Sequence, residues 1–415
     1  MSAVVGILNT QAIAIAADSA VSINGKIYNR ALKIFTLSKH HPIGIMIYSS
    51  ATFMQTPWET IIKMYRANLG DKSFDTLKDY SENFFEYLHT QNFFNDNQLQ
   101  KDYLLQSLIY PLYHNIYNTS KNNIKDDIGI LETLETECER LFVSWNYDGN
   151  LCSEFATFEM QQFDECLKDV FESSIDDFFK ERNIDLKDEI KLKIKTVILA
   201  LIRNQEQFSY YTGLVFAGFG DKQIFPSLLS INVHFAIQNR LKYYETDNVS
   251  ITHDMNSAIR PFAQTDAMNT ILTGIAPNLD NIYTENVTQY IKKYNKKIIG
   301  LTEVNAPEIA AAINEINEEE QIKEFIDKIR EAKRTNYINP LMDAVSSLSK
   351  EDLAEMAESL IYLTYLQKRI TFAAEDVGGA VDVAVISKGD GFIWIKRKHY
   401  FKPELNKFFF DNYFK

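Results

Sequence analysis

Two nearly continuous apolar runs near the N-terminus constrain the fold of this 415-residue chain more than any other feature. Residues 4–8 and 12–17 are apolar throughout, apart from Gly6, and they flank the polar triplet Asn9-Thr10-Gln11. A strand with one face in water alternates polar and apolar residues, whereas a strand buried on both faces does not. We therefore predict that the chain opens with two strands that other parts of the protein cover on both faces.

Further strands are predicted at both ends and in the middle of the chain. Short apolar segments bounded by turn residues occur at 21–23 and 26–28 around Asn24-Gly25, at 33–37, 43–48, 214–217 and 224–233, and at 381–386 and 392–395 around Gly389-Asp390-Gly391. Glycine and asparagine tolerate the positive φ angles of tight hairpin turns, so the first and last of these pairs are predicted hairpins.

The sequence between these strands has helical periodicity. Thr56-Pro57-Trp58-Glu59 predicts a helix with Thr56 as its N-cap and an end at Gly70. Helical patterns then cover residues 74–204 and 277–348. A last helix is predicted with Ser349 as cap and Asp352 three residues later, and its expected buried residues are Leu353, Met356, Leu360, Leu363 and Leu366.

This order of elements predicts an α+β protein whose core is interrupted by helical insertions. The predicted core is discontinuous and consists of residues 1–56, 207–276 and 349–402. Residues 57–206 form a helical segment that combines core helices with an insertion, residues 277–348 form a second helical insertion, and residues 403–415 form a C-terminal tail.

Composition excludes several classes of function. The net charge of −13 and the pI near 5.1 argue against nucleic acid or an anionic membrane as a partner. No apolar stretch approaches the roughly 18 residues of a membrane span, and no secretion signal is recognisable, so we expect a cytoplasmic protein. Cys138, Cys152 and Cys166 lack metal-ligand spacing, and nucleotide-binding motifs are absent. We therefore expect neither a metal nor a cofactor.

Four segments resemble the proteasome β-subunit family of N-terminal-nucleophile (Ntn) hydrolases. Ser2-Ala3-Val4-Val5-Gly6 resembles the start of a mature β-subunit, in which a nucleophile stands four residues before a glycine. The other three matches are Ala16-Ala17-Asp18-Ser19, Lys33-Ile34-Phe35, and the final hairpin from Gly378-Gly379 to Ile386. The resemblance implies a four-layer αββα Ntn-hydrolase sandwich, here with two large helical insertions.

The resemblance also implies a catalytic group made of Ser2, Asp18 and Lys33. Ser2 would act as the nucleophile after removal of Met1, and its free α-amino group, with an ordinary pKa of about 7.7–8.0, would accept the hydroxyl proton. Lys33 would favour the neutral amine and the ionised hydroxyl, and Asp18 would pair with Lys33.

The remaining predicted site residues carry supporting roles. Backbone near Ser49 would form the oxyanion hole, and Ser22 matches a position whose backbone pairs with an extended substrate. The family's glycine-serine-glycine is replaced by Pro261-Phe262-Ala263-Gln264, so Gln264 or Thr265 would supply the polar group. Near the final glycine pair the acidic residues are Glu375 and Asp376, with Val377 in the place of a serine.

These residues leave three functions open. The first is a peptidase or amidase that acts on a peptide or amide substrate through Ser2. The second is a non-catalytic subunit that keeps the Ntn fold for assembly, and the third is a scaffold whose helical insertions bind a partner. The resemblance implies a homo-oligomer, and it makes an unfoldase or another protein a candidate partner.

Overall fold

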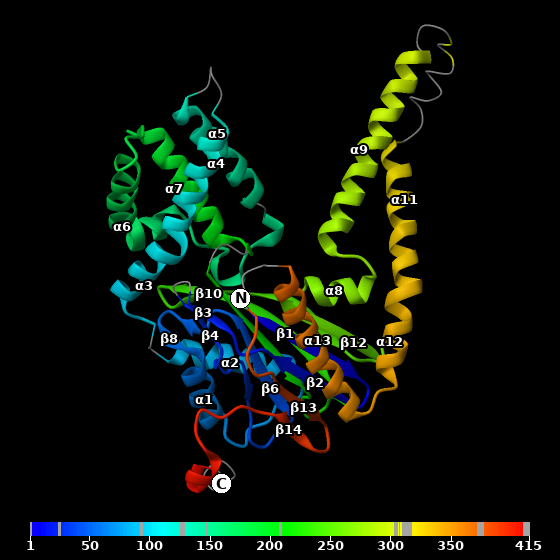
Figure 1. The fold of residues 1–415 in the computed structure, drawn as a ribbon. Helices are drawn as coiled ribbons and strands as arrows, with labels where there is room; N and C mark the ends of the chain where they lie inside the picture. The colour runs from blue at the N-terminus through cyan, green and yellow to red at the C-terminus, as the bar shows by residue number, and fades with distance from the viewer. Residues whose placement is uncertain are drawn as a thin grey trace. The chain divides into compact units, whose positions relative to one another are not determined.

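A computed structural model describes residues 2–23, 26–91, 94–124, 129–146, 148–206, 210–302, 306, 308, 318–371 and 377–409. It contains two five-stranded sheets and many helices, which agrees with the predicted α+β class (Figure 1). The chain divides into two compact units. Met1–Ala31, Ile251–Val385 and Ile393–Lys415 form the first, and Leu32–Ser250 with Ile386–Phe392 form the second. In the described part of the chain, no helix has the length and apolar character needed to cross a membrane.

The first sheet is centred on the two N-terminal apolar runs. Its strand order is β12-β1-β2-β13-β14, and the strands are β1 (Ala3–Asn9), β2 (Ala12–Ala17), β12 (Ser257–Ala263), β13 (Asp382–Ser387) and β14 (Gly391–Lys396). Strand β1 pairs antiparallel with both neighbours, so that Val5 lies opposite Pro261 and Ala16. Every residue of β1 and β2 is buried, which confirms the prediction of two fully buried strands.

Helices of the first unit pack on one face of this sheet. Ala3, Val5 and Ile7 of β1 share a core with Leu353 and Leu360. Val4 and Leu8 on the other face are equally buried. The helical elements of this unit are α8 (Asp266–Thr273), α9 (Pro277–Thr302), α11 (Glu318–Lys333), the π-helical turn Arg334–Ile338, α12 (Asn339–Ser346), α13 (Lys350–Ile370) and the 3-10 turn Pro403–Leu405. A small hairpin joins β3 (Val21–Ile23) to β4 (Lys26–Tyr28).

The second unit contains the other five-stranded sheet, with the order β11-β10-β9-β6-β5. Its strands are β5 (Ile34–Thr36), β6 (Ile43–Ser49), β9 (Thr212–Gly218), β10 (Ser227–Ile237) and β11 (Arg240–Ser250). Helices α1 (Trp58–Leu69) and α2 (Leu77–Thr90) cover one face, where Trp58 and Phe84 share a core with Ile45 and Phe216. The short strands β7 (Thr52–Phe53) and β8 (Thr56–Pro57) precede α1.

The remaining helices of the second unit form a group with its own core. They are α3 (Asn97–Leu104), the π-helical turn Leu105–Ile109, α4 (Tyr110–Asn122), α5 (Ile130–Trp145), the 3-10 turns Asp148–Asn150 and Ser153–Phe155, α6 (Met160–Lys180) and α7 (Asp188–Arg203). Their core contains Phe163, Phe179 and Leu201, and it reaches the sheet through Phe235 and Tyr244.

Several sequence-based details differ from the structure. Thr56 is not an N-cap, because it belongs to strand β8 and helix α1 begins at Trp58 without a side-chain cap. The cap of α13 by Ser349 and Asp352 is confirmed, but Leu363 and Leu366 are exposed. The buried stripe of α13 instead follows the small residues Ala354 and Ala357, which allow close packing on β1 and β2.

Candidate active site

Ser2 lies directly before β1 and is buried, with only 3% of its surface exposed. Its carbonyl accepts a hydrogen bond of 3.0 Å from the Gln264 N–H, and the next residue, Ala3, lies opposite Ala263 of β12. Because Ala3 belongs to the helix-covered face and side chains alternate along a strand, the Ser2 side chain belongs to the opposite face. The backbone around Ser2 is therefore fixed by the sheet.

Asp18 follows β2 directly, and its buried carboxylate holds three backbone groups together. One oxygen, Oδ1, accepts from the Ala3 N–H at 2.9 Å. The other, Oδ2, accepts from the N–H groups of Ala20 at 3.0 Å and Gly378 at 3.1 Å. The Asp18 N–H donates in turn to the Ala3 carbonyl at 3.0 Å. Asp18 thus fixes the residue next to Ser2 and joins it to the glycine pair before β13.

The glycine pair closes tightly over Ser19. The Ser19 N–H donates to the Gly378 carbonyl at 3.0 Å, and the Ser19 hydroxyl donates to the Ala380 carbonyl. Gly379 has a φ of 79°, and a Cβ at this position would lie 2.9 Å from Cβ and the carbonyl oxygen of Asn29. Only glycine accommodates both the backbone angle and the close approach. The backbone therefore requires glycine at position 379, which gives a physical reason for the glycine pair that the sequence resemblance identified.

Gln264 and Thr265 lie between β12 and α8. Besides its backbone bond to Ser2, Gln264 lines a cavity of about 250 Å³ between α8 and α13, together with Thr364 and Gln367. Thr265 stands at the N-cap of α8 but makes no side-chain cap hydrogen bond. Ala263, just before them, has a φ of 64°, a left-handed conformation that non-glycine residues adopt at an energetic cost.

Lys33 and Ser49 belong to the second unit. Lys33 precedes β5 and is almost fully buried, with 4% of its surface exposed, and its carbonyl accepts from the Ile47 N–H at 2.8 Å. Ser49 ends β6 opposite Thr212 and has a φ of 69°. The left-handed angle explains why a glycine would suit this turn, as the sequence resemblance indicates.

Three predicted site residues give less information. Ser22 lies in the β3–β4 hairpin opposite Ile27, and the structure does not describe its side chain. Glu375 and Asp376 lie outside the described residues. Val377, the first described residue after them, is buried among apolar side chains of the first unit.

Sequence reasoning missed a buried polar cluster in the second unit. Lys242 of β11 is fully enclosed, and its ammonium donates to the Leu201 carbonyl near the end of α7 at 2.5 Å. Burial lowers the pKa of Lys242 to about 8. Burial, together with Lys242, also holds the pKa of His234 well below its usual value, and His234 Nε2 lies 3.2 Å from the Tyr244 hydroxyl. No spacing in the sequence distinguishes Lys242 from a solvated strand lysine.

Across the residues that the structure describes, no group of three or more histidine, cysteine, aspartate or glutamate side chains is placed to hold a metal ion. In the first unit, Ser2, Asp18, Gln264 and the glycine pair are linked through the backbone and the Asp18 carboxylate, and Thr265 follows Gln264 in the sequence.

Comparisons with known proteins give only distant similarity. No family model matches the sequence, and no curated protein matches it. Solved structures that align include Anbu from Hyphomicrobium sp. strain MC1, as a Gly-1 mutant, with 9% identity and a TM-score of 0.29. Anbu from Yersinia bercovieri, described as an ancestral beta-subunit, aligns with 9% identity and a TM-score of 0.26. Both alignments cover 99% of this chain and 94% of the other. Scores at this level leave the family and the function of this chain unassigned.

Proposed function

We propose that this protein is an N-terminal-serine hydrolase, a peptidase or amidase that uses Ser2 after removal of Met1. The observation that carries the proposal is the hydrogen bond from the Ala3 N–H to the buried Asp18 carboxylate, at 2.9 Å, directly beside Ser2. A buried carboxylate is costly unless it is fully hydrogen-bonded. Its use to fix the residue next to a buried serine supports a site built around Ser2.

In the proposed reaction, the Ser2 hydroxyl attacks the carbonyl carbon of an amide and the free Ser2 amine accepts the proton. The same ammonium then protonates the leaving amine, and water hydrolyses the acyl-enzyme in a second step. Lys33 would stabilise the developing negative charge, and backbone N–H groups near Ser49 would bind the oxyanion. The mechanism also requires the Lys33 ammonium to lie near the Ser2 hydroxyl. This placement is part of the proposal.

The proposal includes the four-layer αββα sandwich. Two observations support it: each sheet carries helices on one face, and the residues on its second face are also buried, as Val4 and Leu8 are in the first unit and Val215 and Ala217 are in the second. Apolar sheet faces need a covering layer. The discontinuous core of residues 1–56, 207–276 and 349–402 is part of the same proposal, as are an oligomeric, cytoplasmic state and a peptide or amide substrate.

A second candidate is a non-catalytic subunit or scaffold with the same fold. Val377 favours it, because this residue is buried and apolar at the position where the resemblance places a catalytic-site serine. The same geometry at Asp18 and Gly378 would then only stabilise the fold.

Intact-mass measurement of the protein from its native host tests the proposal. We expect a mass lower by one methionine, since a small residue at position 2 permits excision of Met1. The freed amine is needed as the base, so retention of Met1 in the bulk of the protein would exclude the mechanism while leaving the scaffold reading open.

A further inference from the structure

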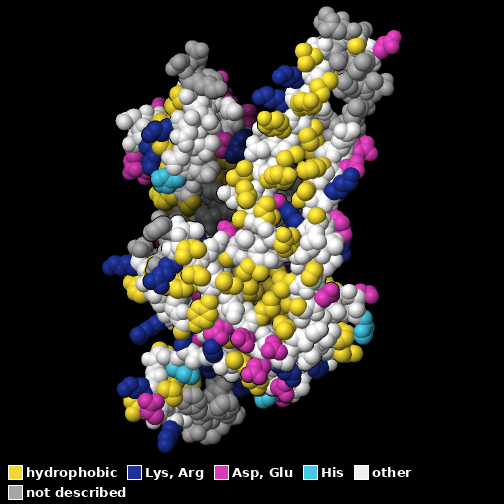
Figure 2. Space-filling view, turned by 45° about the vertical axis from the view of Figure 1, so that its right-hand side comes forward, with side chains coloured by type: hydrophobic (Ala, Val, Ile, Leu, Met, Phe, Trp, Pro, Cys, Tyr) yellow, Lys and Arg dark blue, Asp and Glu magenta, His cyan; other side chains and the backbone are white. Residues whose placement is uncertain are grey.

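Helix α9 exposes a narrow apolar stripe along its length. Leu279, Tyr283, Tyr290, Tyr294 and Leu301 are 45–76% exposed. At 3.6 residues per turn these side chains fall within an arc of about 60° over roughly 33 Å of helix. Figure 2 shows hydrophobic side chains along this helix. Single exposed apolar residues are ordinary, but five large apolar side chains on one side of a helix mark an interaction surface.

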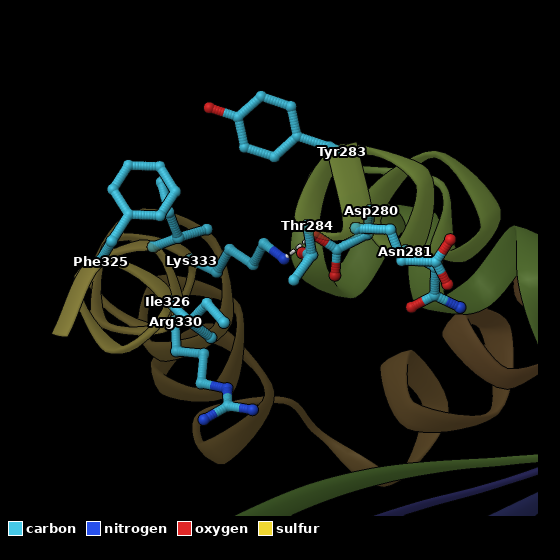
Figure 3. Close-up of a pocket in the computed structure, with 10 residues that line it drawn as sticks. Asp280, Asn281, Tyr283, Thr284, Phe325, Ile326, Arg330 and Lys333 are labelled. Atoms are coloured by element: carbon cyan, nitrogen blue, oxygen red, sulfur yellow. Dashed lines mark hydrogen bonds and ion pairs between the residues drawn. The ribbon is translucent and has the colours of Figure 1, made fainter. Parts of the chain in front are cut away.

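The neighbouring helix α11 does not account for the stripe. Between α9 and α11 lies a cavity of about 230 Å³, spanned by an ion pair between Lys333 and Asp280 (Figure 3). Phe325 and Ile329 line the α11 side of this cavity. The residues of α9 that are partly buried, such as Thr284 and Ile291, lie on a different side of the helix from Tyr290. Tyr283 of the stripe also lines this cavity (Figure 3), whereas Leu279, Tyr290, Tyr294 and Leu301 do not line it and are more than half exposed.

The spacing of the stripe is symmetric about Tyr290. Its seven positions are Leu279, Tyr283, Asn286, Tyr290, Tyr294, Lys297 and Leu301, with steps of four, three, four, four, three and four residues. In an antiparallel pair of such helices, Leu279 meets the partner's Leu301 and Tyr290 meets the partner's Tyr290. Tyr283 then meets the partner's Lys297, and Asn286 meets the partner's Tyr294. A two-fold interface requires this self-complementarity, because residue i contacts j and j contacts i.

The charges of α9 favour the same direction. The N-terminal half carries Asp280 and Glu285 and no lysine, whereas the C-terminal half carries Lys292, Lys293, Lys296 and Lys297. A parallel pair would place the four lysines of one helix against those of the other. An antiparallel pair places them against the half that carries no lysine, which removes this repulsion.

We propose that the exposed stripe of α9 is a self-association surface, on which a second copy of this chain pairs antiparallel about a two-fold axis at Tyr290. Tyrosine supplies large contact area at small cost in side-chain entropy, which suits the centre of a protein interface. The negative net charge of the whole chain argues against an anionic membrane as the occupant. This inference does not depend on catalysis by Ser2.

Cysteine trapping in the full-length protein tests the register. In a Cys166→Ser background, where Cys138 and Cys152 are buried, Tyr290→Cys should form a disulfide-linked dimer under mild oxidation. Leu279→Cys alone and Leu301→Cys alone should not, since each is about 33 Å from its own counterpart in an antiparallel pair. A mixture of these two variants should give a crossed dimer. Efficient self-linking of Leu279→Cys, or no linking of Tyr290→Cys, would overturn the proposal.

Sedimentation analysis supplies an independent test. The chain has a mass of 47.9 kDa, and wild-type protein should contain dimers at micromolar concentration. Tyr290→Asp places two carboxylates at the axis and should weaken dimerisation about 10-fold or more. Tyr362→Asp on α13, at a residue 50% exposed and off the stripe, is the matched control and should leave it unchanged. Equal assembly of wild type and Tyr290→Asp, or a monomer that binds phosphatidylserine vesicles through the stripe, would contradict a second copy as the occupant.

Discussion

Two buried charged side chains, Asp18 and Lys242, are held by the backbone in different ways. Asp18 in the first unit accepts from three backbone N–H groups at 2.9–3.1 Å. Lys242 in the second unit makes, within the described residues, one hydrogen bond, to the Leu201 carbonyl. Both side chains are 1% exposed. The Asp18 charge is therefore well compensated by backbone donors, whereas burial of Lys242 lowers its pKa to about 8.

The different hydrogen bonding indicates different roles: Asp18 orders the candidate site, and Lys242 attaches a helix to a sheet. The donors around Asp18 come from three separate segments, at Ala3, Ala20 and Gly378, so its carboxylate organises the surroundings of Ser2. Lys242 binds near the end of α7, where the helix leaves carbonyl groups without intrahelical partners. Its main effect is to attach that helix to β11, at a cost from desolvation of the ammonium.

Substitution of Asp18 should have the largest effect on stability. Asp18→Ala leaves three backbone N–H groups without this acceptor, and at about 1–3 kcal/mol each we expect a loss of roughly 3–9 kcal/mol in the free energy of unfolding. Asp18→Asn retains one acceptor oxygen and should lose about half as much. Denaturant unfolding measures both. A loss below about 1 kcal/mol for Asp18→Ala would show that these hydrogen bonds contribute little.

Lys242 should act through pH. Because its pKa is lower in the folded state than the ordinary 10.5, the unfolded state binds more protons between pH 8 and 10.5. The contribution of Lys242 to the free energy of unfolding is therefore lowest below pH 8, and it rises as the pH increases from 8 to 10.5. Relative to Lys242→Met, the free energy of unfolding of wild type should increase by about 3 kcal/mol from pH 7.5 to 10.5.

The difference between the two proteins isolates Lys242 from other groups near it that titrate, namely Cys152, Glu206 and His234. Lys222→Met is the matched control, because Lys222 is exposed and its pKa is raised by its hydrogen bond to Asp75. The difference in the free energy of unfolding between Lys222→Met and wild type should stay constant from pH 7.5 to 10. A flat difference for Lys242→Met as well would mean that the ammonium is not desolvated.

Ala263 should give the smallest effect. Its φ of 64° beside Ser2 and Gln264 is strained for alanine, so Ala263→Gly should raise stability by about 0.5 kcal/mol after the entropy of glycine is subtracted. Ser49→Gly, at a φ of 69° in the other unit, should behave similarly. Thermal unfolding measures both variants. Destabilisation by either glycine would show that the side chain makes contacts that outweigh the backbone strain.

The sequence predicted the strands and caps whose causes are local. Residues 12–17 are apolar throughout because both faces of β2 are covered, and Ser349 with Asp352 forms its capping box from residues three apart. Strands β11 and β12 were not predicted. Residues such as Lys242, Asp247 and Pro261 break the patterns that indicate a strand, and pairing with β10 and β1 overrides their local preference.

The candidate site was partly predictable for a similar reason. Asp18 and Gly378-Gly379 stand out through motif and backbone geometry, and the structure brings them together through one hydrogen bond. The link between Gln264 and Ser2 depends on the register of distant strands, which no short motif encodes. The same holds for Lys242, whose burial follows from the packing of α7 on β11.

Labelling by a serine-directed probe tests the central proposal most directly. Protein freed of Met1 is treated with phenylmethylsulfonyl fluoride, and the modified residue is located by peptide mass spectrometry. The account predicts a single adduct on Ser2 that disappears in Ser2→Ala, while the midpoint of thermal unfolding stays nearly unchanged. An adduct that persists in Ser2→Ala, or an unmodified Ser2 after prolonged treatment of the folded protein, would contradict a nucleophile at this position.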